Sequence, residues 1–178
     1  GLGDVYKRQP FYDKELISMA ADHADMAETA FQHYDEKLPD MHDPLDRHYY
    51  NPFSAVYKVP MSDQIFVAQS SFIRRLAEQG PCVIVGRCAD RVLTDSVNLF
   101  IYAKMKDRVK RMVSLEPEAD PQEMEKRIRE VDRKRKDYYQ YYTGAQWGRA
   151  QNYHLCVESG LVGVDGCLRA ALAYLGEN

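Results

Sequence analysis

At residues 81–90 the sequence reads Pro81-Cys82-Val83-Ile84-Val85-Gly86-Arg87-Cys88-Ala89-Asp90. The first half of this stretch is almost continuously apolar rather than alternating, which is typical of a parallel strand covered on both faces. A glycine and an arginine follow where the strand would end. In open α/β sheets, ligands bind at the carboxyl ends of the strands. The stretch therefore predicts a buried strand with a charged side chain at a binding edge.

Two further apolar runs, residues 97–103 and 153–158, have the same character and are predicted to be buried strands. Apolar residues at helical spacing lie between and around these runs. They predict helices at residues 63–78, 106–115, from Pro121 onward, and at 164–175. Strands that alternate with helices predict an α/β fold with a doubly wound parallel sheet.

Two segments fit neither pattern. Residues 38–60 are rich in Pro, Asp, His and Tyr, and residues 138–150 follow the most highly charged predicted helix without becoming a strand. Long excursions in a compact domain are usually lids or binding loops. We therefore predict that residues 38–60 are loop-dominated and that both segments are lids or binding loops.

The overall composition excludes several classes of protein. The 178 residues suit one domain, and a net charge of −3 argues against a general nucleic-acid binder. No apolar run approaches the roughly 20 residues that cross a bilayer, and the lack of a signal-peptide core favours the cytoplasm. The four cysteines form no CxxC pair and the five histidines are scattered, so we expect reduced thiols and no metal site.

Four segments in sequence order resemble the cytidylate-kinase-like family: residues 10–17, 81–90, 132–144 and 152–156. The resemblance implies a P-loop NTPase-like parallel sheet covered by helices in a domain of residues 10–178. It also implies a helical acceptor-binding insert at about residues 20–62 and a lid at about residues 114–150. The implied reaction transfers the γ-phosphoryl group of ATP, with Mg²⁺, to CMP or dCMP.

The family's phosphate loop is expected upstream of residues 10–17. Only nine residues precede Pro10, whereas a strand, a loop and a helix need about 30 residues. Gly1-Leu2-Gly3 lacks the Lys-Ser/Thr pair of a GxxxxGK[ST] loop. We therefore expect residues 1–9 to be a foreign or disordered leader, the first strand and helix to be missing, and the activity of this chain to be impaired.

Arg87 is the first candidate for substrate binding. Its guanidinium fork suits a bidentate grip on the acceptor's phosphate, and the resemblance implies the same role. The alternative is a stabilising salt bridge to Asp90. Asp90 itself could orient Arg87, bind the cytosine amino group or cap a helix, and Asp13 could lie near the acceptor or cap a helix.

The lid supplies the catalytic candidates. Phosphoryl transfer needs cationic groups that neutralise the moving phosphoryl group, and the resemblance gives this role to Arg135 and Arg133. Arg135 forms an Asp-x-x-Arg pattern with Asp132, a further substrate-binding candidate. The alternative is an ordinary charged helix surface. The nearby aromatic residues are expected to pack the lid rather than to stack on a base: Tyr138, Tyr139, Tyr141, Tyr142 and Trp147.

Three functions remain open at this point. The first is an ATP-dependent cytidylate-type kinase. The second is a kinase that phosphorylates another small acceptor on the same fold, because no residue pattern here identifies the base. The third is a catalytically inactive nucleotide-binding or regulatory module.

Overall fold

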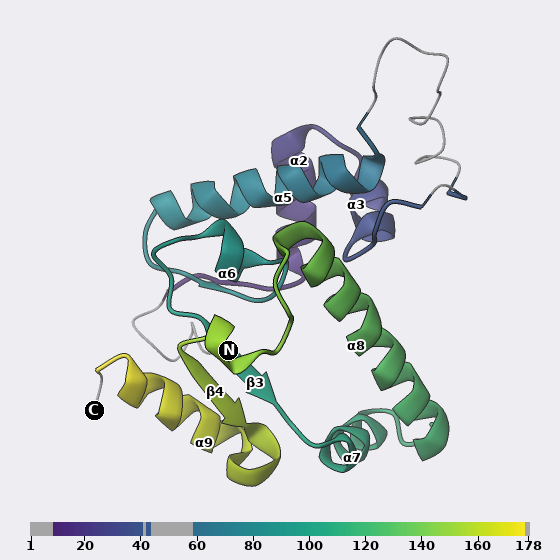
Figure 1. Cartoon of the computed structure of the whole chain (residues 1–178), viewed down its shortest axis with the longest axis vertical. Coiled ribbons are helices and arrows are strands. Elements are labelled where there is room, and N and C mark those ends of the chain that lie inside the picture. Colours follow the sequence, from purple (N-terminus) through teal and green to yellow (C-terminus); the bar gives the residue numbers. More distant parts are fainter. Residues whose placement is uncertain (1–8, 41, 44–58, 177–178) are drawn as a thin grey trace. The chain divides into compact units, whose positions relative to one another are not determined.

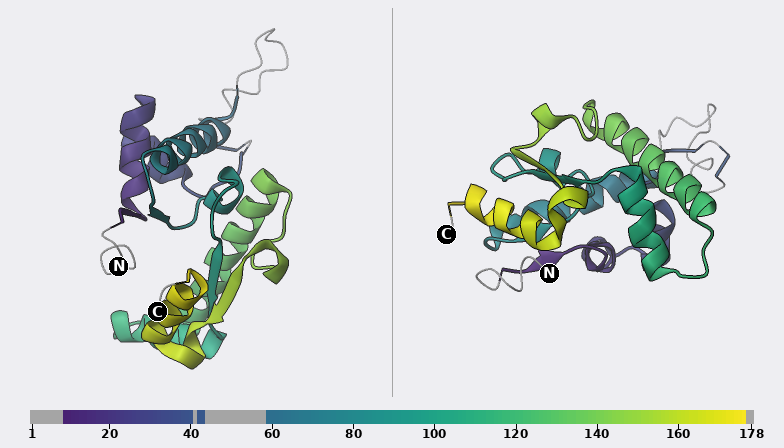
Figure 2. Two further views of the ribbon diagram at one scale, coloured as in Figure 1. Left: turned by 90° about the vertical axis from the view of Figure 1, so that its left-hand side faces the viewer. Right: turned by 90° about the horizontal axis from the view of Figure 1, so that it is seen from below.

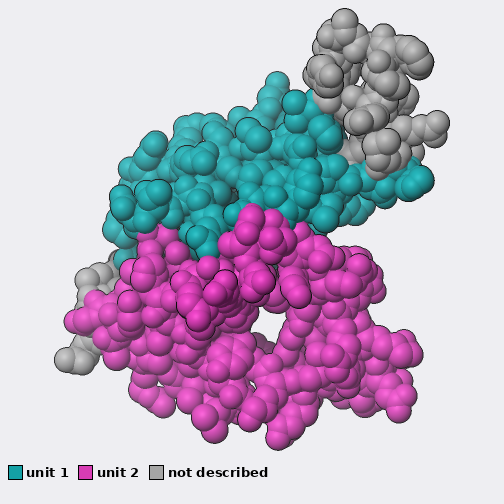
Figure 3. Space-filling view, in the orientation of Figure 1, with its two compact units in different colours: residues 1–95, 141–143 teal, residues 96–140, 144–178 magenta. Residues whose placement is uncertain are grey.

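The computed structural model describes residues 9–40, 42, 43 and 59–176 (Figure 1). The chain is an α/β protein and divides into two compact units. The first comprises residues 1–95 and 141–143, and the second comprises residues 96–140 and 144–178 (Figure 3). No described helix is long and apolar enough to cross a membrane.

The first unit is built on a short pair of parallel strands. β1 (Phe11–Tyr12) pairs in parallel with β2 (Val83–Ile84). Between them in sequence lie α2 (Glu15–Ala24), α3 (Glu28–Tyr34) and α5 (Met61–Glu78), and α6 (Ala89–Val92) follows β2. These helices are labelled in Figure 1.

The core of the first unit forms where α5 packs against α2 and α3 (Figure 2). Apolar residues at helical spacing on these three helices turn toward one another. The fully buried side chains that they contribute include Leu16, Phe31, Ile65 and Ile73. The core thus fixes the segments that lead into and out of both strands.

The second unit contains a second parallel pair, β3 (Leu99–Tyr102) with β4 (Leu155–Glu158). The helices α7 (Met105–Leu115) and α8 (Pro121–Thr143) and a 3₁₀ turn (Ala150–Asn152) connect the two strands. The last helix, α9 (Ser159–Tyr174), is kinked at Gly163 and packs on both strands. Each unit therefore has its own parallel pair with helices in the crossover.

α8 shows how local sequence sets the limits of an element. The Asp120 side chain accepts a hydrogen bond from the Glu123 amide at 3.3 Å, and Pro121 occupies the first turn, as at many helix starts. Gly144 ends the helix in the left-handed conformation, φ +68°, with its amide bonded to the Gln140 carbonyl.

The predicted elements can be compared with those observed. The three apolar runs do contain β2, β3 and β4, although each strand is shorter than its run. Parallel pairing is confirmed, but the strands of the described residues form two two-stranded sheets, whereas one doubly wound sheet was predicted. Residues 138–150, assigned from the sequence to a lid or binding loop, begin with Tyr138–Thr143, which are the last turns of α8. Residues 1–8 of the predicted leader and most of residues 38–60 lie outside the described residues.

Candidate functional site

The turn after β2 has an unusual backbone. Gly86, Arg87 and Cys88 all have positive φ, at 77°, 53° and 56°. Glycine adopts this left-handed conformation readily, whereas other residues are uncommon there. Two successive non-glycine residues in this region store backbone strain of about 1–3 kcal/mol each. Such strain persists where the surroundings over-determine it, often at a functional site.

Arg87 lies at the centre of this turn with only 7% of its side chain exposed. Its Nη1 donates to the Val85 carbonyl at 3.2 Å, and its Nη2 donates to Oδ2 of Asp35 at 3.1 Å. The buried Nε has no hydrogen-bond partner among the described residues. A buried donor without a partner is rare in proteins. One edge of the guanidinium is thus left for a further acceptor.

Two carboxylates surround Arg87. Asp13 follows β1 and its Oδ1 lies 3.9 Å from Nη1 of Arg87, while Asp35 directly follows α3. Because β1 and β2 are parallel, the residues after them meet at the same edge of the sheet. This accounts for the predicted proximity of Asp13 to the candidate site. The alternative of Asp13 as a helix cap fails, because Lys14 is the N-cap of α2 and no side chain caps it.

Asp90 forms no ion pair with Arg87. The ion pairs of Arg87 among the described residues are with Asp35 and Asp13, so the alternative of a stabilising salt bridge to Asp90 is not observed there. Asp90 lies in the first turn of α6, and its carboxylate is 3.7 Å from Nε of Arg91.

Cys88 is the buried neighbour of Arg87 in the turn. Burial, with the negative charges of Asp90 and Glu36, raises the pKa of the Cys88 thiol to about 12. At neutral pH this thiol is protonated and therefore a poor nucleophile. Cys88 is a packing residue of the turn, and all four cysteines are free thiols.

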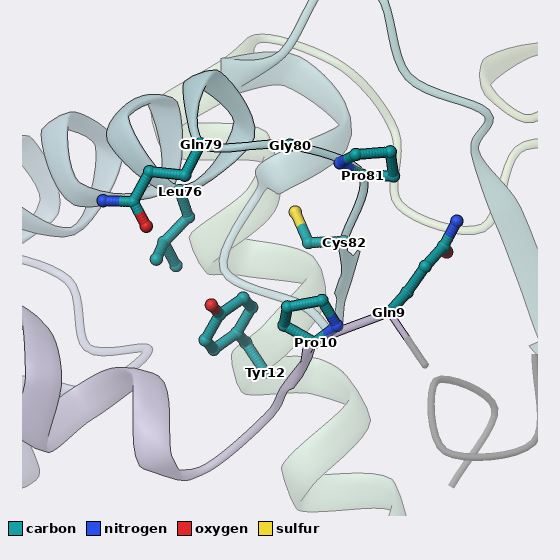
Figure 4. Close-up of a pocket in the computed structure, with 8 residues that line it drawn as sticks. All are labelled: Gln9, Pro10, Tyr12, Leu76, Gln79, Gly80, Pro81 and Cys82. Atoms are coloured by element: carbon teal, nitrogen blue, oxygen red, sulfur yellow. The ribbon is translucent and has the colours of Figure 1, made fainter. Parts of the chain in front are cut away.

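A separate cavity of about 470 Å³ lies at the other ends of the same strands (Figure 4). Pro10 precedes β1 and Cys82 precedes β2, so the cavity is at their amino ends, opposite to Arg87. Its lining carries no cationic side chain: Gln9, Pro10, Tyr12, Leu76, Gln79, Gly80, Pro81 and Cys82. The cavity is therefore a poor site for a phosphate.

The lid candidates lie on α8, in the second unit. Asp132 is held by Arg108 of α7 in a bidentate pair, with Nη2 to Oδ1 at 2.8 Å. Arg133 is exposed and lies 3.8 Å from Asp137, and Arg135 is exposed on the same helix. The structure thus pairs Asp132 with Arg108, a residue that the sequence pattern did not single out.

The sequence itself matches a family over most of its length. Residues 8–161 match the cytidylate kinase-like family. This chain belongs to that family. The match covers Asp13, Arg87, Asp90, Asp132, Arg133 and Arg135.

One solved structure has a fold similar to that of this chain. A crystal structure of an uncharacterized protein from Eubacterium ventriosum is 26% identical, with a TM-score of 0.69. The similarity covers 98% of this cytidylate kinase-like chain and 87% of the other chain. A comparison with the curated proteins found no match.

In this member of the cytidylate kinase-like family, Tyr138, Tyr139 and Tyr142 near the end of α8 are packing residues. The Tyr142 ring stacks on Phe66 at 4.0 Å between centroids, and its hydroxyl donates to Asp63 at 2.8 Å. Tyr138 and Tyr139 are buried. In the second unit, Trp147 packs edge-on against Phe100 at 5.5 Å.

Proposed function

We propose that this chain binds the acceptor of a nucleoside-monophosphate kinase, which transfers the γ-phosphoryl group of ATP to CMP or dCMP. The observation that supports the proposal most directly is the orphaned Nε of the buried Arg87. A phosphate oxygen would satisfy this donor and form a charge-assisted hydrogen bond with it. Membership of the cytidylate kinase-like family supports a phosphotransferase in general.

In this proposal the acceptor's phosphate binds at the carboxyl edge of β1 and β2. Arg87 grips the phosphate, and Asp13 and Asp35 hold the guanidinium. Asp90, in the first turn of α6 beyond the same edge, is the candidate for contact with the cytosine amino group. Two carboxylates beside one arginine leave little net positive charge at this edge, so phosphoryl transfer needs further cationic groups.

Arg135 and Arg133 are the proposed source of that positive charge during transfer. Both are exposed on α8, where they are accessible to a nucleotide. Charge spread over the oxygens of the moving phosphoryl group is best stabilised by positioned cations. Asp132, tied to Arg108, then supports the lid rather than touching the substrate.

Mg²⁺ enters the proposal together with ATP. Among the described residues, no three His, Cys, Asp or Glu side chains gather into a site that could hold a metal ion. Mg²⁺ is usually bound through substrate phosphates, one or two carboxylates and several waters, rather than in an all-protein cage. The ion would shield the donor phosphates, and it needs no resident site in this chain.

The test is calorimetric titration of the full chain with CMP, dCMP, UMP and cytidine. We expect CMP or dCMP to bind more tightly than cytidine, because only the nucleotides carry the phosphate. Arg87→Lys removes the planar fork and should weaken CMP binding about 10-fold to 100-fold, the equivalent of one lost hydrogen bond to a charged group. Arg74→Lys, at an exposed arginine on α5, is the matched control and should bind like the parent.

A parent chain that binds none of the monophosphates more tightly than cytidine would refute the proposed function. If the parent chain binds UMP or another monophosphate most tightly, the result supports the phosphate site and shows that the acceptor is not CMP or dCMP. A coupled assay of ADP release with ATP and each acceptor then distinguishes a kinase from a module that only binds.

A further inference from the structure

The ion pair between Arg87 and Asp35 joins two distant parts of the first unit. Asp35 follows α3 and Arg87 follows β2, 52 residues later in the sequence. Only 21% of the Asp35 side chain is exposed, against 7% for Arg87. A pair this deeply buried interacts strongly, and loss of either member leaves an uncompensated charge. Asp35 is therefore the principal counter-ion of Arg87.

Asp35 is itself held from a second side. Nε2 of Gln69, on α5, donates to Oδ1 of Asp35 at 3.4 Å, and Gln69 is 1% exposed. Oδ2 of the same carboxylate accepts from Arg87. Because its two oxygens bind groups on different elements, the carboxylate has little freedom to rotate. A fixed carboxylate orients the guanidinium that binds to it.

The nitrogens of Arg87 divide into two groups. Nη1 and Nη2 are engaged by the Val85 carbonyl and by Asp35, whereas Nε has no partner among the described residues. Asp13 is 3.9 Å from Nη1 and 43% exposed, so its pull on the guanidinium is weaker. Asp35 therefore binds Arg87 at Nη2 and leaves Nε available to donate to a ligand.

We propose that Asp35 is a positioning residue for the acceptor's phosphate, acting through the orientation of Arg87. This inference rests on the proposed function. The opposing possibility is that Asp35 competes with the phosphate for Arg87. The two roles predict opposite changes in phosphate affinity when Asp35 is lost. Loss of a positioning residue weakens phosphate binding, whereas loss of a competitor strengthens it.

The test measures CMP and cytidine affinity by calorimetry for the parent and for Asp35→Asn in the full chain. We expect CMP to bind Asp35→Asn at least about 10-fold more weakly, the lower bound for one misdirected charge-assisted bond. Cytidine should bind within about 2-fold of the parent, because it has no phosphate. The ratio of the two affinities separates positioning from general damage, which would weaken both ligands.

Two further variants complete the experiment. Asp22→Asn changes an exposed carboxylate on α2 and should leave the affinity ratio unchanged. Asp35→Glu keeps the charge but displaces the carboxylate by one methylene, and it replaces Asp35→Asn if circular dichroism shows that the latter does not fold. It should also lower the CMP-to-cytidine ratio.

The outcomes are distinguishable. If the parent prefers CMP to cytidine and the folded Asp35 variant keeps or increases that preference, the positioning role is wrong and the proposed function stands. If the parent shows no preference for any monophosphate, the proposed function fails and this inference fails with it. If the CMP-to-cytidine affinity ratio falls in the Asp35 variant but not in Asp22→Asn, the result supports both the proposed function and the positioning role.

Discussion

Replacing Tyr142 with Phe removes one hydroxyl and keeps the ring. The hydroxyl donates to Oδ1 of Asp63 at 2.8 Å, while the ring stacks on Phe66 with an interplanar angle of 11°. A hydrogen bond to a charged group contributes about 1.5–3 kcal/mol to stability. Because Tyr142 is only partly buried, we expect Tyr142→Phe to lower the free energy of unfolding by about 1.5 kcal/mol at pH 7, the low end of that range.

The stability difference between the parent and Tyr142→Phe should decrease at high pH. Burial, followed by the hydrogen bond to Asp63, raises the pKa of Tyr142 above its ordinary value. A raised folded pKa gives stability that is complete below the unfolded pKa, about 10 for tyrosine, and declines above it. The decline is about 1.4 kcal/mol per pH unit for one proton. The difference between parent and Tyr142→Phe should therefore shrink by about 1.4 kcal/mol between pH 9 and pH 11.

Urea unfolding followed by circular dichroism at pH 7, 9 and 11 measures both effects. Tyr141→Phe is the matched control at pH 7, because that ring is 56% exposed and its change should stay within about 0.5 kcal/mol. Two results would refute the reasoning. One is a Tyr142→Phe protein as stable as the parent at pH 7, and the other is a stability difference that stays constant from pH 9 to pH 11.

Two other predictions concern the second unit and the turn after β2. A double-mutant cycle of Arg108→Gln with Asp132→Asn should give a coupling energy of about 1 kcal/mol in urea unfolding, the upper end for exposed pairs. The same cycle on the exposed pair Arg133–Asp137 should give a coupling energy of no more than about 0.3 kcal/mol. Equal coupling energies for the two pairs would contradict the difference between their distances and exposures. Cys88, with its raised pKa of about 12, should resist iodoacetamide at pH 8 while the half-buried Cys156 and Cys167 react, as peptide mass spectrometry would detect.

The sequence predicted β2, β3 and β4 and the helices α5, α7, α8 and α9, because continuous apolar runs and helical spacing are local signals. It failed at Tyr138–Thr143, where four tyrosines in five residues have modest helix propensity. The helix continues there because Tyr138 and Tyr139 are buried and Tyr142 stacks on Phe66. Tertiary packing decides the end of α8, and no local pattern encodes it.

The residues of the candidate site also divide into those that could be predicted from the sequence and those that could not. Arg87 and Asp13 could be predicted because each follows an apolar stretch, and parallel pairing brings the ends of such stretches together. Asp35, Gln69 and Arg108 could not be predicted. Their partners lie 24 to 52 residues away, so no spacing rule connects them. The charged stretch around Asp132 did indicate a charged helix surface, but not that Arg108 of α7 would bind Asp132.

The turn at Arg87 is hard to explain by stability alone. A buried ion pair is often no more stabilising than an apolar pair of similar volume, and the left-handed conformations of Arg87 and Cys88 add strain that glycine would relieve. An Nε buried without a partner among the described residues is a further cost. All three costs fall on Arg87 or on its neighbour Cys88, in the turn at the carboxyl end of a parallel strand. An anion bound at Nε would offset them together, whereas a purely structural arginine would leave each of them unexplained.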